Sequence, residues 1–284
     1  MRASQWSVVF GVMMGMVPIA RAQDAAPTAY EFEAVRDIAY RTDAEADPVK
    51  HKLDLYVPKG AKDFPVLFFV HGGAWQSGSK GLYGKLGETF AKLGIGAVVI
   101  NYRLSPAVKH PTHIQDVAKA FAWTVANVGK HGGNAERIFA AGHSAGGHLV
   151  SLLATDDRWL KAEALSVKNL RGVVPMSGVY TIVPKLRVFE VPFGTDENIL
   201  KDASPLTHVR EALPPFLLIY ADKDFPQCDK MSDDMCKKLK EHRVEASVSE
   251  IKDRNHITII IGCVVESDPA TQAIVNFVRK YAGK

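Results

Sequence analysis

Short apolar runs alternate with longer helical stretches along most of this chain. Val66–Val70 is the clearest run, with five consecutive apolar residues, as expected for a strand that is buried on both faces of a sheet. Other segments that read as strands are Ala97–Ile100, Ile138–Ala141, Val173–Met176, Phe216–Tyr220 and the alternating Ala246–Ile251. The segments that repeat apolar residues with the period of a helix are Leu82–Leu93, Ile114–Val128, Ala145–Leu153, Met231–His242 and Thr271–Tyr281.

Strands that alternate with helices predict an α/β fold: a mostly parallel central sheet with helices on both faces. Phe32–Tyr40 and His51–Val57 read as an antiparallel pair that opens the sheet, joined by a charged turn at Asp47-Pro48. No repeat, linker or low-complexity segment interrupts residues 32–284. The pattern therefore predicts a single domain over this range.

Residues 1–22 have the features of a cleavable secretory signal. Arg2 supplies a positive charge, Trp6–Ile19 is apolar, and Ala20-Arg21-Ala22 places small residues before a cut at Gln23. The apolar stretch is shorter than the roughly 20 residues that a transmembrane helix needs. We therefore expect a secreted or periplasmic protein without stable membrane association, whose residues 23–31 form a flexible N-terminus.

The formal net charge of +4 is small for 284 residues. Basic and acidic residues are interspersed without a basic stripe, which disfavours nucleic-acid binding. Phosphate-binding glycine loops and zinc-ligand spacings are both missing, so we expect neither a cofactor nor a metal.

The three cysteines leave the disulfide pairing open. Cys228 and Cys236 lie on a predicted helix, about 12 Å apart by helical rise, which is too far for a disulfide. Either Cys228 pairs with Cys263, or all three remain thiols.

The strongest chemical signal is the pentapeptide Gly142-His143-Ser144-Ala145-Gly146. It follows a predicted strand and opens a predicted helix, the context in which G-x-S-x-G forms a nucleophile elbow. There the serine has a strained backbone conformation, and the glycines avoid clashes with the neighbouring strand and helix. Ser144 is therefore the candidate nucleophile.

A second signal, His71-Gly72-Gly73-Ala74-Trp75, directly follows Val66–Val70. A tetrahedral intermediate of acyl transfer needs two backbone N–H groups that point at its oxyanion. One comes from the residue after the nucleophile, here Ala145, and the other from the loop after this earlier strand. Gly73 or Ala74 is the expected donor, and His71 is expected to orient the loop.

A serine hydroxyl needs an adjacent base, which a carboxylate orients. In the chain order Ser, acid, His, the acid follows Phe216–Tyr220, where Asp222 and Asp224 both qualify. Asp224 is favoured because its position gives the loop room to turn back toward the sheet edge. His256 follows the last strand and is the candidate base. His143 points away from the serine on a tight elbow and is a candidate substrate-binding residue.

With these residues assembled, the chain from about residue 33 onward resembles the α/β-hydrolase superfamily. It is most similar to carboxylesterases of the hormone-sensitive-lipase and feruloyl-esterase-like (BD-FAE-type) branch. The motifs that carry the resemblance, in family order, are His71–Trp75, Asn101–Pro106, Gly142–Gly146, Ala203–Leu206, Tyr220–Asp224 and Asn255-His256. The resemblance implies a triad of Ser144, Asp224 and His256, and scaffold roles for Arg103 and Asp116.

The chain departs from the hormone-sensitive-lipase pattern in two ways. Ala74 replaces a third glycine and is followed by Trp75, as in feruloyl-esterase-like and arylformamidase-like members. Strand-like sequence begins near Phe32, so we do not expect the long N-terminal cap of many lipase relatives. Val179–Asp202 is the insertion best able to form a lid. This insertion and Trp75 are the candidate pocket walls, and so small a lid favours water-soluble esters.

The sequence thus predicts a secreted serine carboxylesterase that cleaves small-molecule esters of short-chain or aryl and feruloyl type through an acyl-enzyme. An arylformamidase or small-amide hydrolase would use the same triad and stays an alternative. A non-catalytic binding protein with this fold is disfavoured, because such proteins lose members of the triad.

Overall fold

The computed structural model describes residues 29–184 and 186–283, so the predicted signal at residues 1–22 lies outside the described part. The predicted flexible segment lies partly within it, and its last two residues are tied to the domain. The N–H of Tyr30 donates to the carbonyl of Lys92 at 2.9 Å, and the carbonyl of Glu31 accepts from the N–H of Lys59 at 2.8 Å. Within the described residues, every helix is too short or too polar to cross a bilayer.

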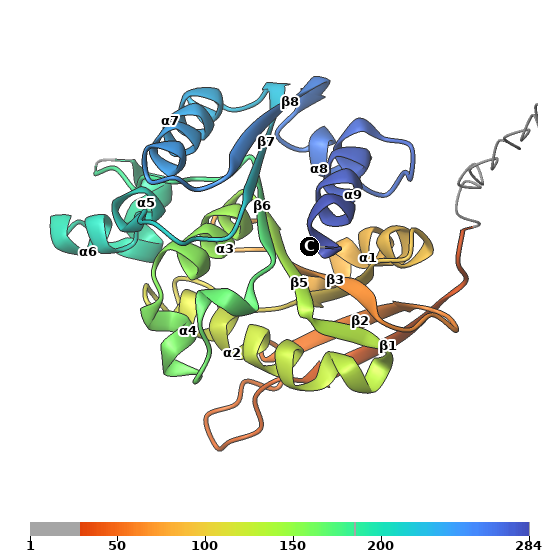
Figure 1. The fold of residues 1–284 in the computed structure, drawn as a ribbon. Helices are drawn as coiled ribbons and strands as arrows, with labels where there is room; N and C mark the ends of the chain where they lie inside the picture. The colour runs from red at the N-terminus through yellow and green to blue at the C-terminus, as the bar shows by residue number, and fades with distance from the viewer. Residues whose placement is uncertain (1–28, 185, 284) are drawn as a thin grey trace, which may run out of the picture.

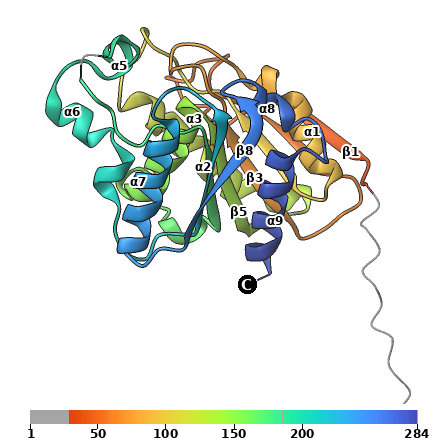
Figure 2. The same cartoon turned by 90° about the horizontal axis from the view of Figure 1, so that it is seen from above.

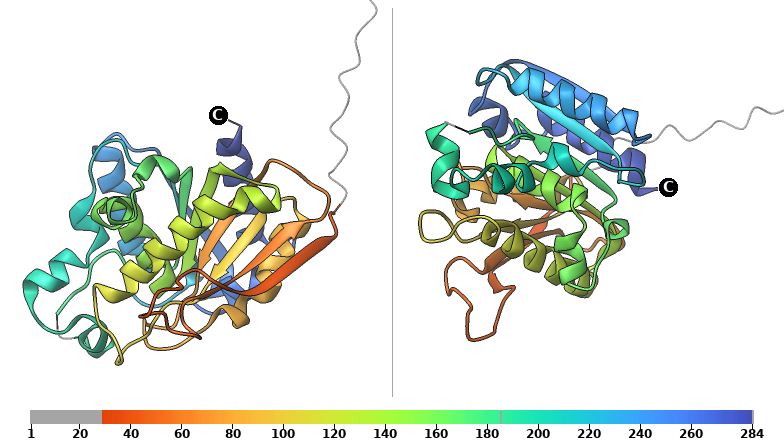
Figure 3. Two further views of the ribbon diagram at one scale, coloured as in Figure 1. Left: turned by 90° about the horizontal axis from the view of Figure 1, so that it is seen from below. Right: turned by 90° about the vertical axis from the view of Figure 1, so that its left-hand side faces the viewer.

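Eight strands form one mostly parallel sheet with helices on both faces, which confirms the predicted fold class. Their order across the sheet is β1-β2-β4-β3-β5-β6-β7-β8. The β1–β2 and β2–β4 pairs are antiparallel and the other pairs are parallel; Figure 3 shows the red-orange first strands at one edge. The strands are β1 (Phe32–Ala39), β2 (Lys52–Pro58), β3 (Phe64–Val70), β4 (Gly96–Ile100), β5 (Gly133–His143), β6 (Gly172–Met176), β7 (Phe216–Lys223) and β8 (Ala246–Asn255).

The helices divide into two layers, one on each face of the sheet (Figures 1 and 2). One layer holds α1 (Gly84–Lys92), α8 (Thr258–Gly262) and α9 (Pro269–Ala282). The other layer holds α2 (Thr112–Asn127), α3 (Ala145–Thr155), α4 (Arg158–Ala162), α5 (Arg187–Phe193), α6 (Glu197–Asp202) and α7 (Cys228–Glu241). Short 3₁₀ helices add to these, among them η1 (Lys80–Tyr83) directly before α1.

The apolar run in β3 supplies both faces of the core. Phe68 is fully buried in the cluster that includes residues of α2 and α3, whereas Phe69 is fully buried in the cluster with residues of α1 and α9. Successive side chains of a strand point to opposite faces, so a strand covered on both sides must be apolar at every position. Complete burial of such a side chain stabilises the fold by about 1.5–3 kcal/mol.

Neighbouring parallel strands end in register at one edge of the sheet. Val70 pairs with Gly142, His143 with Met176, and Lys223 with Asn255. The residues that follow these strands therefore emerge side by side. In open α/β sheets, ligands bind at this carboxyl edge.

Candidate active site

Ser144 stands on a sharp turn between β5 and α3, with φ 54° and ψ −117°. A non-glycine residue in this region is strained and persists only where the surrounding structure enforces it. The N–H of Ser144 donates to the carbonyl of Met176 at 2.8 Å, which holds the turn against β6. A Cβ on Gly146 would lie 2.0 Å from the carbonyl oxygen of Val70, so only glycine fits there. The elbow predicted from sequence is present.

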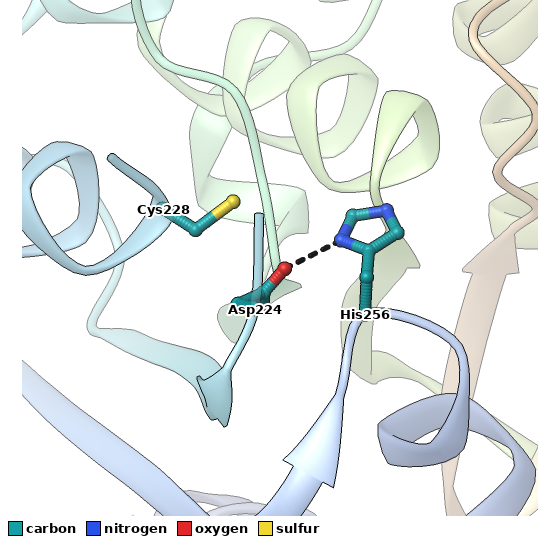
Figure 4. Close-up of side chains that lie close together, drawn as sticks. All are labelled: Asp224, Cys228 and His256. Carbon is teal, nitrogen blue, oxygen red and sulfur yellow. Dashed lines mark hydrogen bonds and ion pairs between the residues drawn. The ribbon is translucent and has the colours of Figure 1, made fainter. Parts of the chain in front are cut away.

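Asp224 and His256 are adjacent because β7 and β8 end in register, one residue before each of them. The Nδ1–H of His256 donates to Oδ1 of Asp224 at 2.6 Å (Figure 4). This bond leaves Nε2 of the imidazole as the free base. Asp222, the less favoured alternative, accepts instead from the N–H of Arg254 at 3.0 Å.

Asp224 is held as an anion by more than the histidine. The hydroxyl of Ser177, the residue after β6, donates to its Oδ2 at 2.5 Å. Burial works against ionisation of Asp224, but the hydrogen bonds from His256 and Ser177 outweigh it and hold the pKa of this carboxyl well below its usual range. Sequence reasoning missed Ser177, whose only signal was its place directly after a buried strand.

The loop after β3 curls over Ser144 and is shaped by Gly73. The φ of Gly73 is 121°, and its carbonyl accepts from the N–H groups of Gln76 at 3.0 Å and Ser77 at 2.9 Å. Among the described residues, no acceptor pairs with the backbone N–H of Ala74 or with that of Ala145, the first residue of α3. Both donors are therefore available to a ligand.

His71, which is predicted to orient this loop, has two contacts that hold its ring in place. Its Nδ1–H donates to the carbonyl of Gly72 at 2.7 Å, and its ring stacks on that of Tyr102 at 4.5 Å between centroids. Burial lowers the pKa of His71 to about 4, so the ring is neutral. On the other side of the loop, the N–H of Gly72 donates to the hydroxyl of Tyr83 at 3.3 Å.

Most of the predicted residues meet at one cavity of about 690 Å³, although Asp224, Ala145 and Trp75 are not among the residues that line it. Ser144, His256, Gly73 and Ala74 line it, and so does His143, predicted to bind substrate. The Nε2–H of His143 donates to the carbonyl of His256 at 2.8 Å, which steadies the base. Burial, and then the nearby His256, lower the pKa of His143 to about 3.

The two predicted pocket walls lie elsewhere. Trp75 is 2% exposed, its Nε1–H donates to Nδ1 of His148 at 3.2 Å, and it packs against Phe189 and Phe193. The insertion Val179–Asp202 forms α5 and α6, which Figure 2 shows on the opposite side of the molecule from α8. No residue of it lines the cavity within the described part of the chain. Phe189, Phe193 and Leu200 of the insertion are instead buried in the core cluster that includes residues of α3.

Arg103 and Asp116, for which the resemblance implies scaffold roles, form an ion pair. The guanidinium of Arg103 donates twice to the buried carboxylate of Asp116, at 2.9 and 2.7 Å, and Nε2 of His51 lies 3.1 Å from the same carboxylate. Neither Arg103 nor Asp116 is among the residues that line the cavity.

Cys228, Cys236 and Cys263 are all free and buried, so the alternative of three thiols holds.

Within the described residues, Asp224, Cys228 and His256 form the one group of potential metal ligands, with ligand atoms within 4.8 Å of one another (Figure 4). Burial and the neighbouring Asp224 raise the pKa of the Cys228 thiol to about 12, which keeps it protonated. A protonated thiol and a carboxylate already bonded to imidazole make a poor metal site.

This chain is similar in sequence to a protein family and to several known enzymes. The sequence matches the BD-FAE family over residues 53–239. It is 37% identical over 177 residues to the probable carboxylic ester hydrolase LipM of Mycobacterium tuberculosis, which covers 56% of this chain and 41% of that protein. It is 26% identical over 236 residues to the kynurenine formamidase of Danio rerio, covering 81% and 78% of the two proteins.

The chain spans less than half the length of the mycobacterial relative, at 41%. Among solved structures, a truncated carbohydrate esterase from gut microbiota has a TM-score of 0.76 and 20% sequence identity, and the match covers 91% of this chain and 99% of the other. At this identity, the likeness concerns the fold alone.

Proposed function

The chain belongs to the BD-FAE family of α/β-hydrolases, and from this premise we propose that it is a serine carboxylesterase. One observation carries the proposal: His256, which is hydrogen-bonded to Asp224, lines the same cavity as Ser144, and Ser144 stands on a strained turn. This arrangement meets the needs of a triad, a nucleophile with a base that a carboxylate orients. The relatives LipM and esterase LipC, both named for ester hydrolysis, support the reaction class.

In the proposed acylation, Nε2 of His256 takes the proton of Ser144 while the serine oxygen attacks the ester carbonyl carbon. The carbonyl electrons move onto oxygen, where the N–H groups of Gly73, Ala74 and Ala145 are the proposed donors. The N-terminus of α3 adds a favourable dipole there. Collapse breaks the bond to the alcohol, which leaves with the proton from His256, and the acyl group stays on Ser144.

Deacylation repeats these steps with water. His256 takes a proton from water as the water oxygen attacks the acyl carbon, and the serine oxygen then leaves with that proton. The products are a carboxylic acid and the regenerated Ser144. Throughout, Asp224 stabilises the transiently charged imidazole.

Gly73→Ala tests the proposed oxyanion loop. A Cβ at Gly73 would lie 2.2 Å from the carbonyl oxygen of Ser77, and φ is 121°, so the loop must rearrange. We expect kcat to fall by about 10²–10³-fold, as when one oxyanion donor is lost, with thermal unfolding as the check on folding. Gly81→Ala is the matched control, because its nearest neighbour would be the Ser79 hydroxyl at 3.7 Å. Equal activity of the two variants would contradict this role.

A formamidase is the second candidate, favoured by the similarity to kynurenine formamidase over 81% of the chain. The same residues would cleave the C–N bond of a formamide by the same two steps. Because the amine is a poorer leaving group than a phenol, proton transfer from His256 to the leaving group would contribute more to the rate of that reaction.

A panel of p-nitrophenyl acetate, p-nitrophenyl butyrate, methyl ferulate and N-formylanilide separates the two reactions. We expect the esters to be hydrolysed with higher kcat/KM than the formanilide. Cleavage of the formanilide alone would replace the esterase by the formamidase.

Export remains part of the proposal and rests on residues 1–22. When the protein is purified from the exporting cell, N-terminal sequencing should show that the mature chain begins at Gln23.

A further inference from the structure

The cavity beside Ser144 has an apolar wall that acyl transfer by itself does not require. Apart from Ser144, His256, His143 and the loop after β3, its lining consists of aliphatic and aromatic side chains: Leu82, Tyr83, Leu86, Phe225, Ile257, Ile260, Ile261 and Val264. Among the described lining residues, none is Asp, Glu, Lys or Arg. We call these eight residues the apolar wall.

One side of the wall comes from α8 and the residues that flank it. This segment is apolar on two sides: Ile259 and Cys263 are fully buried in the core, while Ile257 and Ile261 line the cavity. Ile257 is 55% exposed and Ile261 57% exposed. Anchoring the helix needs only the first side, so the water-exposed isoleucines point to a ligand that covers them.

The opposite side comes from η1 and α1, with Leu82 75% exposed at the rim and Leu86 buried behind it. The Thr89 hydroxyl donates to the carbonyl of Val264 at 2.9 Å and fixes α1 against the end of α8. Phe225 stacks on the ring of His256 at 4.1 Å between centroids and extends the wall up to the base. The wall is therefore fixed in place and continuous with the reacting centre.

A saccharide or a charged group would lose its hydration here without finding polar partners, which is costly. A cavity of about 690 Å³ also far exceeds an acetyl group and falls in the range that holds drug-sized ligands. We propose that the apolar wall binds an apolar group of at least about six carbons on the substrate ester. This inference rests on the proposed esterase function and names its substrate class.

Two series of esters test the inference and show which side of the ester enters the cavity. The acyl series runs from p-nitrophenyl acetate to p-nitrophenyl octanoate. The alcohol series runs from methyl acetate to octyl acetate, and its hydrolysis is measured by the protons that the product acid releases. In one series, kcat/KM should rise about two- to fourfold per methylene up to at least six carbons, the gain expected for burial of each group. Highest activity on acetate in the first series and on methyl in the second would overturn the inference.

The double variant Ile257→Ser, Ile261→Ser removes two exposed apolar side chains from the wall. We consider the series in which kcat/KM rises with chain length in the wild type. In that series, we expect the ratio of kcat/KM for the longest ester to kcat/KM for the shortest (octanoate to acetate, or octyl to methyl) to fall at least tenfold. Ile199→Ser is the matched control, because Ile199 is 40% exposed on α6, away from the cavity, and this variant should keep the wild-type ratio. An unchanged ratio in the double variant would also overturn the inference. By contrast, no hydrolysis of any ester and no reaction with a fluorophosphonate would remove the proposed function itself.

Discussion

Replacing Ser144 with alanine should lower kcat/KM for ester hydrolysis by about four or more orders of magnitude, because the variant has no atom that can form the acyl-enzyme. The loss should appear in kcat for every ester that the wild type cleaves. The measurement is steady-state hydrolysis of p-nitrophenyl butyrate, with circular dichroism to show that α3 and β5 remain folded.

Ser247→Ala is the control for this variant, because Ser247 is an exposed serine on β8 outside the cavity and should keep full activity. Retention of more than about 1% of wild-type activity by Ser144→Ala would contradict the assignment, since loss of a triad nucleophile costs far more.

Asp224→Asn should have the second largest effect, a fall in kcat of about 10⁴-fold. The carboxylate accepts the Nδ1–H of His256 at 2.6 Å and so leaves Nε2 free to act as the base. An asparagine amide can donate to Nδ1 instead, which places the proton on Nε2 and removes the base. The shape of the residue is preserved, so the defect should lie in kcat while the thermal midpoint changes little.

Asp222→Asn is the matched control because it makes the same substitution two residues away. Asp222 accepts from the backbone N–H of Arg254 at 3.0 Å, a bond that the asparagine carbonyl can keep. This variant should stay within about twofold of the wild type, as expected for a surface substitution. If Asp222→Asn were the inactive variant and Asp224→Asn the active one, the acid would have been assigned to the wrong residue.

The sequence predicted the sheet well because buried strands must be apolar on both faces. The apolar runs mark only the buried middle of each strand, however. β5 begins at Gly133 rather than Ile138, and its polar start is held at the surface by the ion pair of Arg137 with Asp63 at 2.9 Å. Such ends follow from pairing with a neighbouring strand, which local periodicity does not encode.

α8 was missed for a related reason. Its Ile259-Ile260-Ile261 run is β-branched and favours a strand by local propensity. Burial of Ile259 against the core keeps it helical instead, so tertiary packing overrides the local preference.

The candidate site could be predicted where a motif marks a backbone geometry. The glycines around Ser144 and in the loop at Gly73 are needed by tight turns, and the order of strands fixes where Asp224 and His256 emerge. Side-chain direction was harder to predict. Trp75 is the last residue of the loop motif, but with a φ of 58° its side chain points into the core beside His148. The apolar wall lines the cavity instead.

Covalent labelling of the wild-type protein with a fluorophosphonate, followed by mass mapping of the modified peptide, tests directly whether Ser144 is the nucleophile. We expect one equivalent of label on Ser144, with no label on Ser144→Ala and slow labelling of His256→Ala. Label on another serine, or none on a folded wild-type protein, would contradict the assignment of Ser144 as the nucleophile.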